Sequence, residues 1–358
     1  MSYSILTFFL YILCQYSSNA IVLQLPMRST GSLRARLMAQ GRWTAVVDKY
    51  RQNLAVHSQP FLDWYDGFYT VNISLGLPPQ YFTMAFDTGS ANFWVVDKDS
   101  CTHAACSGYT SYDYTKKRYD PTISQTVIPD RSGRRFSLRY GTGFSTGKYV
   151  YEFTSFGSLY VKNQTLGLAD GVADVLGYQP IDGVLGMAWP AVAANKFPAP
   201  VFNMLDQLDE PTTSSMVRLT VTNPMLIILV IFSVGRQRRL GDIWWKGFGQ
   251  LSLRVELSVS AQYSVSHDLY IVPCESRENF TDIIFTMENV EYHIPPSEYV
   301  IDVGLGDGQC ALGVFGMYAD GFNADWIFGD TFIDSFCNLY DMGKGRMGFA
   351  KAKDSLRY

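Results

Sequence analysis

The chain has 358 residues, of which 47% are hydrophobic and 17% charged, and this balance excludes a disordered protein. The length is sufficient for two domains, each with a sizeable hydrophobic core. The formal net charge of −4 argues against a nucleic-acid-binding protein, because such proteins carry basic patches. Short runs rich in Gly, Tyr, Phe and Thr favour a mostly β protein.

Residues 1–20 contain a short apolar core at residues 5–14, followed by small and polar residues that end in Ser18-Asn19-Ala20. This pattern is typical of a secretory signal peptide, although the usual basic start is missing. A membrane anchor is the less favoured alternative, because the apolar core is too short to cross a bilayer. We therefore expect a secreted chain with no stable membrane span.

Residues 21–58 form a basic leader with six Lys or Arg residues and one Asp. Its charge of +5 leaves −9 for residues 59–358. Such a leader would be attracted to the acidic body at neutral pH and less so at acid pH, where carboxylates are protonated. An amphipathic N-terminal helix that belongs permanently to the first domain is the alternative.

Residues 84–96 predict a buried strand that ends at Asp87, turns through Thr88-Gly89-Ser90 and continues as a second strand. The Thr88 and Ser90 hydroxyls and nearby backbone N–H groups could hydrogen-bond the Asp87 carboxylate. A carboxylate fixed in this way can act as an acid or a base. Taken alone, the tetrapeptide is equally well explained as an ordinary Asp-x-Gly turn between two strands.

Residues 136–147 predict a β-hairpin, because residues 136–140 alternate in polarity and Gly141-Thr142-Gly143 form a tight turn. A glycine-rich tip suits a segment that opens and closes, although an ordinary surface hairpin has the same pattern. Further along, residues 200–208 have apolar side chains at helical spacing and predict a short helix.

Five cysteines follow the predicted signal peptide. Cys101 and Cys106 are close together, and Cys274 and Cys310 flank a strand-rich stretch, so either pair could form a disulfide in a secreted chain. Cys337 is then left without an assigned partner. The cysteine spacings do not suggest a metal site, and we expect no cofactor.

Several stretches resemble, in the same order, pepsin-like aspartic endopeptidases of the cathepsin D and pepsin type. The stretches are residues 69–96, 140–143, 181–188, 326–330 and 348–350. Residues 22–26 and 32–34 are similar to the propeptides of the zymogens of this family. The resemblance covers most of the chain from about residue 23 to residue 350. It implies a mostly β, bilobal fold, in which the cleft lies between two β lobes and each lobe supplies one aspartate from an Asp-Thr/Ser-Gly loop.

The resemblance also implies roles for individual residues. Asp87 would be one catalytic carboxylate. The hairpin would be the flap that closes over the substrate. The two disulfides Cys101–Cys106 and Cys274–Cys310 are suggested too. The other implied site residues are Tyr140, Gly141 and Thr142 in the flap, and Thr88, Gly89, Ser90 and Trp94 as support for the catalytic loop. Trp94 could line the cleft, or it could equally be a core tryptophan.

The resemblance fails in the block 212–261, where the second Asp-Thr/Ser-Gly is expected and none occurs. The apolar run at residues 224–234 begins at a proline and is too short to span a bilayer, but it could be a buried strand. Translated intron or a faulty gene model is the interpretation we favour. Residues 300–304 contain another apolar-Asp-x-Gly pattern, but Asp302 lacks a following hydroxyl and lies too late in the chain to be the second acid.

We therefore predict an aspartic-type endopeptidase that cleaves proteins at acid pH with an Asp-activated water and is made as a secreted zymogen. The alternative is a catalytically dead relative that binds peptides or proteins. The predicted partners are protein or peptide substrates and the chain's own propeptide as intramolecular inhibitor. We expect a monomer in a secreted, lysosomal or digestive acidic compartment, glycosylated at Asn-x-Ser/Thr sites. The candidate sites are Asn72, Asn163 and Asn279.

The predicted organisation has five segments, with a C-terminal lobe disrupted by the atypical block. The segments are a signal peptide (1–20), a propeptide (21–58), an N-terminal β lobe with Asp87 and the flap (59–211), the atypical block (212–261) and a partial C-terminal β lobe (262–358).

Overall fold

The computed structural model describes residues 26–30, 33–45, 69–109, 114–140, 143–207, 212–223, 226–235, 252–254, 261–267, 269–287, 290–314, 328–342 and 346–351. The predicted signal peptide lies outside these residues. The chain is mostly β, as predicted. Among the residues described, no helix has the length and hydrophobicity needed to span a bilayer.

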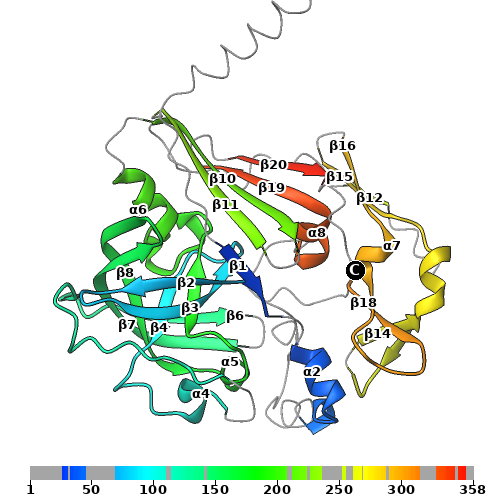
Figure 1. Cartoon of the computed structure of the whole chain (residues 1–358), viewed down its shortest axis with the longest axis horizontal. Helices are drawn as coiled ribbons and strands as arrows, with labels where there is room; N and C mark the ends of the chain where they lie inside the picture. The colour runs from blue at the N-terminus through cyan, green and yellow to red at the C-terminus, as the bar shows by residue number, and fades with distance from the viewer. Residues whose placement is uncertain are drawn as a thin grey trace, which may run out of the picture.

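The N-terminal part is a set of paired strands with short helices at its edges (Figure 1). Its strands are β2 (Tyr69–Leu75), β3 (Gln80–Asp87), β4 (Phe93–Val96), β5 (Ile128–Pro129), β6 (Arg135–Tyr140), β7 (Gly143–Phe156), β8 (Leu159–Val172) and β9 (Gly183–Gly186). Its helices are α4 (Ala104–Ser107), α5 (Asp174–Gly177) and α6 (Pro200–Asp206), with 3-10 turns η2 (Pro190–Val192) and η3 (Ala194–Lys196). Helix α6 forms where the apolar spacing predicted it.

The remaining elements belong to the leader and to the second half of the chain. The leader contributes β1 (Pro26–Ser29) and α2 (Leu33–Ala39). The second half contains β10 (Thr212–Asn223), β11 (Leu226–Gly235), β12 (Ser252–Arg254), β13 (Gln262–Ser264), β14 (Leu269–Pro273), η4 (Cys274–Asn279), β15 (Ile283–Met287), β16 (Val290–Ile294), α7 (Pro296–Tyr299), β17 (Val300–Ile301), β18 (Gln309–Leu312), α8 (Asp330–Ser335), β19 (Phe336–Asp341) and β20 (Arg346–Lys351).

Alternation along the strands places two hydrophobic clusters on opposite faces of the N-terminal sheet. Met84 on β3 and Val95 on β4 belong to one cluster, which also contains Trp189. Their chain neighbours Ala85 and Trp94 belong to the other cluster. Successive side chains of a strand point to opposite faces, so both faces of β3 and β4 are covered. This burial on two sides fixes the strand pair from which the Asp87 turn emerges.

A long sheet joins the first and second halves of the chain (Figure 1). Within the atypical block, β10 and β11 form an antiparallel hairpin, and β10 also pairs with β19. The leader strand β1 pairs with β11 on one side and with β2 on the other. The described part of the apolar run at residues 224–234 lies in the paired strand β11, and the burial expected in one of our alternatives stays a prediction.

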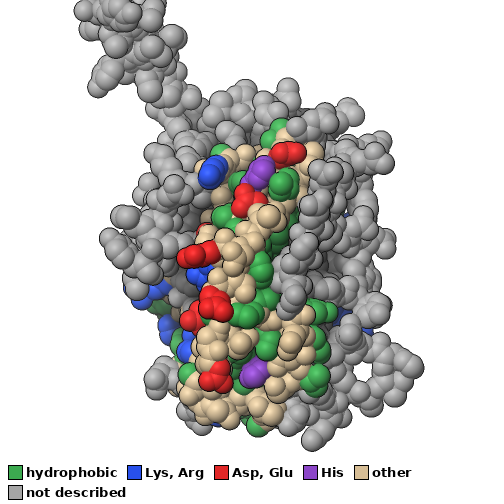
Figure 2. Space-filling model, turned by 90° about the vertical axis from the view of Figure 1, so that its right-hand side faces the viewer, with side chains coloured by type: hydrophobic (Ala, Val, Ile, Leu, Met, Phe, Trp, Pro, Cys, Tyr) green, Lys and Arg blue, Asp and Glu red, His purple; other side chains and the backbone are tan. Residues whose placement is uncertain are grey.

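The second half also has two smaller sheets, β12-β15-β16 and β13-β14-β18-β17, over an aromatic-rich core. A disulfide between Cys274 and Cys310 joins the end of β14 to β18, with a Cα–Cα distance of 4.9 Å. Residues 261–314 carry nine acidic residues and a single basic residue, Arg277. Acidic side chains accordingly run down the face that Figure 2 turns toward the viewer. The net charge of this region is therefore −8, compared with −9 for residues 59–358 as a whole.

A buried pair of ionisable groups stands behind β3. The Asp182 carboxylate is fully buried and accepts hydrogen bonds from the backbone N–H groups of Thr83 and Lys117, each at 2.7 Å. The nearby Lys116 ammonium donates to the carbonyl oxygens of Gln179 and Ile181. Burial lowers the pKa of Lys116 to about 7, although the Asp182 charge opposes this change. The pair ties the loop before Tyr119 to the start of β9.

Replacing Lys116 with Met should change how stability depends on pH. The Lys116 pKa is about 7 in the folded state and 10.5 by its ordinary value, so between these values the unfolded chain binds more protons. The free energy of unfolding of the wild type, relative to Lys116→Met, should therefore rise with pH by at most about 1.4 kcal/mol per pH unit. Urea unfolding between pH 7 and about 9 measures this.

Lys98→Met is the matched control. Lys98 is exposed, and its hydrogen bond to Asp120 raises its pKa, so it stays protonated in both states over this range. Its profile should run parallel to that of the wild type. A parallel profile for Lys116→Met as well would contradict a buried ammonium at this position.

Candidate active site

Asp87 is the last residue of β3, where the strand lies between β2 and β9. Strands β3 and β9 are parallel, and Asp87 is in register with Gly186. A Cβ atom at Gly186 would lie 2.5 Å from the backbone nitrogen of Asn92, so only glycine fits this close approach. The glycine lets the chain that leaves the Asp87 turn pass directly over the end of β9.

The turn after Asp87 directs its hydrogen-bond donors at the carboxylate. The backbone N–H of Gly89 donates to Oδ1 at 2.8 Å, and the Ser90 hydroxyl donates to Oδ2 at 2.5 Å. The main chain is also held, since Met187 N donates to the Asp87 carbonyl and Ala188 N to that of Ser90. The predicted hydrogen bonding of Asp87 by its own turn is therefore present, with Ser90 supplying the hydroxyl.

The pKa of the Asp87 carboxyl group is raised above its ordinary value. Burial raises its pKa above the ordinary 3.8, and the hydrogen bonds from Ser90 and Gly89 offset only part of this effect. The side chain nevertheless keeps some solvent exposure. A carboxyl group with a raised pKa, at a partly open position, is suited to proton transfer at acid pH.

Tyr340 reaches the Asp87 turn from the C-terminal strand β19, and the sequence did not identify it. Tyr340 is 8% exposed, and its ring centroid lies 6.1 Å from that of Trp189. Burial raises the pKa of Tyr340, with a further contribution from the Asp87 charge. Residues 336–341 carry no motif, so no local signal could have pointed to this contact.

The predicted flap forms a hairpin of β6 and β7, with Tyr140 in register with Gly143. Gly141 and Thr142 lie outside the described residues, and for Tyr140 only the backbone is described. The roles of these three residues in substrate binding stay predictions. Phe144, just beyond the tip, is 46% exposed.

Trp94 lies in the core and does not line a cleft. It is 2% exposed and packs with Ala85 and Val184 behind the Asp87 strand. Its neighbours Phe93 and Val95 pack on the opposite face of the sheet. Of the two roles left open for Trp94, the structure therefore supports the core tryptophan.

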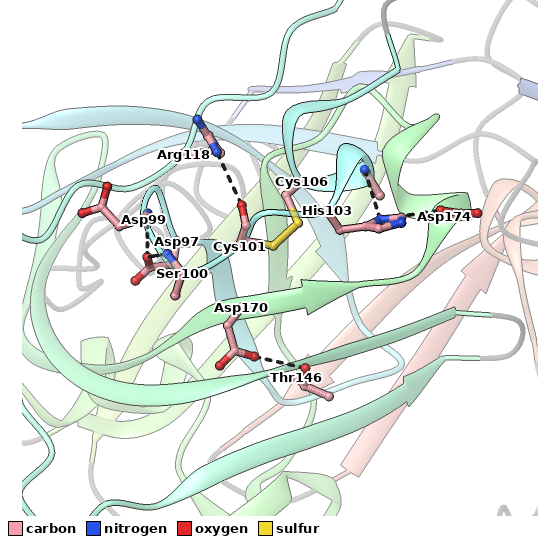
Figure 3. Close-up of a disulfide and its surroundings, with 11 residues drawn as sticks. Asp97, Asp99, Ser100, Cys101, His103, Cys106, Arg118, Thr146, Asp170 and Asp174 are labelled. Carbon is pink, nitrogen blue, oxygen red and sulfur yellow. Dashed lines mark hydrogen bonds and ion pairs between the residues drawn. A yellow bond between two sulfur atoms is a disulfide. The ribbon is translucent and has the colours of Figure 1, made fainter.

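A disulfide between Cys101 and Cys106 closes the loop after β4 (Figure 3). The loop begins with the buried Asp97, whose Oδ1 accepts hydrogen bonds from the backbone N–H groups of Asp99 and Ser100. His103 precedes α4, and its Nδ1 lies 3.7 Å from Oδ1 of Asp174. Both disulfides suggested by the resemblance are thus present, and Cys337 lies on β19.

The other candidates are exposed or distant from this site. Asp302 is exposed and accepts a hydrogen bond from the backbone N–H of Gly304, as in an ordinary turn, so it does not supply a buried second acid. Asn72, Asn163 and Asn279 are also exposed. Within the described part of the chain, no group of three or more His, Cys, Asp or Glu side chains could hold a metal ion.

Replacing Asp87 with Asn should remove a stability penalty that grows with pH. Because the folded-state pKa lies above 3.8, the folded protein binds more protons than the unfolded chain between the two values. The wild type should therefore lose stability relative to Asp87→Asn as the pH rises from about 4, and the difference should level off above the folded-state pKa. Thermal unfolding at a series of pH values measures it.

Asp120→Asn provides a control of opposite sign. The hydrogen bond from Lys98 lowers the pKa of Asp120 to about 2, so its contribution to stability increases as the pH rises toward 4. The same sign for both substitutions would contradict the burial of the Asp87 carboxylate.

The chain is similar in sequence to known proteins over most of its length. The family model described as eukaryotic aspartyl protease matches residues 68–219 and 251–352, and residues 220–250 lie between the two matched ranges. Aspartic protease 1 of Caenorhabditis elegans is 35% identical over 93% of this chain and 96% of its own length. Gastricsin of Callithrix jacchus is 28% identical, with coverage of 95% and 98%. Vacuolar protease A of Arthroderma otae is 28% identical, with coverage of 80% and 78%. The chain therefore belongs to the eukaryotic aspartyl protease family and shares its pepsin-like fold.

Proposed function

We propose that the chain derives from an aspartic-type endopeptidase that hydrolyses proteins at acid pH, and that this polypeptide retains at most a small part of that activity. The observation that carries the proposal is the Asp87 carboxyl group, which is hydrogen-bonded at a strand end with a raised pKa. Family membership supplies the reaction class, and this geometry supplies the acid.

Peptide hydrolysis in this family needs two carboxyl groups, and the aspartic proteases are a standard example of two carboxyl groups that share one proton. The ionised carboxylate takes a proton from the attacking water, while the protonated one polarises the peptide carbonyl. Asp87 would be one member. The sequence has no second Asp-Thr/Ser-Gly, so the water lacks one partner. A general acid or base contributes roughly 10²–10⁴ in rate, which sets the expected loss.

The leader acts, in this proposal, as the propeptide of a zymogen. Helix α2 presents Leu33 and Leu37 to the cluster behind Asp87, and both are fully buried. Its Ala35 and Met38 contact the cluster of Leu269, Val303 and Ala311 in the second half. Trp43 is 2% exposed, and its indole N–H donates to the His267 carbonyl at 3.1 Å. A short segment between two cores can hold both halves of the molecule.

Charge supports the same role for the leader. The leader has a net charge of +5, opposite in sign to that of the rest of the chain, in which residues 261–314 carry nine acidic residues and a single basic one. Carboxylates are protonated in acid, so a leader held by charge should be held less firmly there. Salt should weaken the attraction as well, because exposed charges are screened within about 10 Å at 0.1 M ionic strength.

The proposal keeps the predicted organisation of the chain in five segments. They are residues 1–20, 21–58, 59–211, 212–261 and 262–358. Secretion or delivery to an acidic compartment is supported by the signal-peptide pattern, the two disulfides and the exposed Asn-x-Ser/Thr sites. One relative is itself named a vacuolar protease. A monomeric state completes the proposal.

A catalytically dead peptide-binding relative is the second candidate, favoured by the missing second motif. The transcript across residues 212–261 separates the candidates. Spliced RNA that reads through this block supports the binding protein. RNA that encodes an Asp-Thr-Gly there shows that the natural chain is an ordinary enzyme.

The full chain should cleave an unfolded protein at about pH 4 at a rate roughly 10²–10⁴ lower than a gastricsin under the same conditions. Asp87→Asn should remove the remaining cleavage, because it takes away the described acid. Asp302→Asn, which changes an exposed turn aspartate, should leave the rate unchanged. Release of new peptide termini measures all three.

A rate equal to that of gastricsin would show that a second acid exists in the chain. Cleavage that survives Asp87→Asn would exclude Asp87 as the acid. Peptide binding without any turnover would support the dead relative instead.

Trp43→Ala should loosen the leader. The substitution removes a buried ring and the N–H that donates to the His267 carbonyl, so limited proteolysis should cut the leader several-fold faster at neutral pH. Arg42→Ala, at the half-buried neighbour, is the control and should have a much smaller effect. Equal rates for wild type and Trp43→Ala would contradict the anchoring role.

A further inference from the structure

One face of the N-terminal sheet carries exposed aromatic side chains. Tyr81 on β3 is 65% exposed, and Tyr160 on β8 is 52% exposed. Tyr81 is in register with Ser74 of β2, and Ser74 is also in register with Ser155 of β7. Ser155 is in turn in register with Tyr160. Residues paired across antiparallel strands point to the same face, so the two tyrosines stand on one face, about 14 Å apart, with two small serines between them.

Tyr160 has a second aromatic ring beside it. The rings of Phe153 and Tyr160 are stacked, with their centroids 5.3 Å apart, and Phe153 is half-buried. The Lys162 ammonium group lies 5.8 Å from the centroid of the Tyr160 ring. We call Tyr81, Phe153 and Tyr160 the aromatic platform. Exposed apolar surface of this kind marks a place where another group binds.

Asn72 stands on the same face, two residues before Ser74 on β2. It lies opposite Thr83 of β3, which makes Tyr81 its diagonal neighbour, about 7 Å away. Asn72 is exposed, and the Thr83 hydroxyl donates to its Oδ1 at 3.0 Å. This bond holds the side-chain oxygen and leaves Nδ2, the atom that takes an N-linked sugar, outside it. Asn72-Ile73-Ser74 is an acceptor sequence for such a sugar.

We propose that Asn72 carries an N-linked glycan whose first sugars lie on the aromatic platform and stabilise the N-terminal sheet. A pyranose ring has an apolar C–H face that packs on an aromatic ring, while its hydroxyl groups stay in water, and this fits rings that are half exposed. Ser74 and Ser155 leave room for a flat sugar beside Tyr81, and their hydroxyls can hydrogen-bond it.

The sugar is attached in the secretory route of the proposed function, on which this proposal rests, and no catalytic activity of the chain is needed. The co-reactant is an oligosaccharide linked to a lipid through a diphosphate. Nδ2 of Asn72 forms a bond to the first sugar's anomeric carbon and gives up one proton. The bond from that carbon to the diphosphate oxygen breaks, and the lipid diphosphate leaves with the electron pair.

The test is thermal unfolding of the full chain, secreted from a eukaryotic host, after the mass of the peptide that contains Asn72 has shown whether sugar is attached. Ser74→Ala removes the acceptor sequence but keeps Asn72 and its bond to Thr83. It should lower the unfolding midpoint by about 2–4 °C. Ser74→Thr keeps the acceptor sequence and should retain both the sugar and the wild-type midpoint. Tyr81→Ala should lower the midpoint by a similar amount in the glycosylated chain, and by much less in the Ser74→Ala background, where no sugar lies on the ring.

Thr281→Ala is the matched control. It removes the acceptor sequence of Asn279, in the second half of the chain, and should leave the effect of Tyr81→Ala unchanged. A secreted chain with sugar at Asn279 but none at Asn72 would overturn the proposal and leave the secretory route intact. An equal effect of Tyr81→Ala with and without the Asn72 glycan would also overturn it. So would light scattering that finds a dimer for the glycosylated chain and a monomer for Tyr81→Ala, because a second copy would then cover the platform. These measurements need no turnover, so they fail or succeed independently of the cleavage assay.

Discussion

The burial of one carboxyl group at the end of β3 is the constraint on which the site depends. Burial raises the pKa of Asp87, while the Gly89 N–H and the Ser90 hydroxyl stabilise its charged form. The opposing effects leave a group that can hold a proton and can also release it. The parallel pairing of β3 with β9 makes this possible, because it fixes the backbone on both sides of the turn.

The second half of the chain contacts the region of Asp87 through packed side chains. No second Asp-Thr/Ser-Gly motif is present in the sequence. Tyr340 brings β19 against the Asp87 turn, and the leader helix α2 packs against clusters of both halves. The hairpin of β10 and β11 connects β19 to the leader strand β1. The strand pairing thus joins the two halves of the chain in one sheet.

Local features were predictable from the sequence. Asp87 ends a strand and is bound by its own turn, because the Thr-Gly-Ser that follows encodes both the bend and the donors. The hairpin of β6 and β7 and the helix α6 follow from alternation and helical spacing. The role of Trp94 was not predictable, because an aromatic residue after a turn fits a core and a cleft equally well.

Long-range contacts could not be predicted in this way. Nothing in residues 336–341 distinguishes Tyr340 from any strand tyrosine, since the cluster into which it packs, with Trp189, comes from the other half of the chain. Likewise, the sequence of the leader gives its charge but not the burial of Leu33, Leu37 and Trp43 in the cluster behind Asp87. The pairing of β11 with β1 has the same origin, because a uniformly apolar strand does not specify its neighbours.

The most direct measurement is the titration of the Asp87 carboxyl carbon by carbon-13 NMR in the full chain between about pH 3 and pH 7. The account predicts a midpoint clearly above 3.8, since desolvation dominates over the hydrogen bonds. A midpoint at or below 3.8 would mean that Asp87 is an ordinary hydrated turn aspartate, and the proposal of an acid protease site at this position would fail.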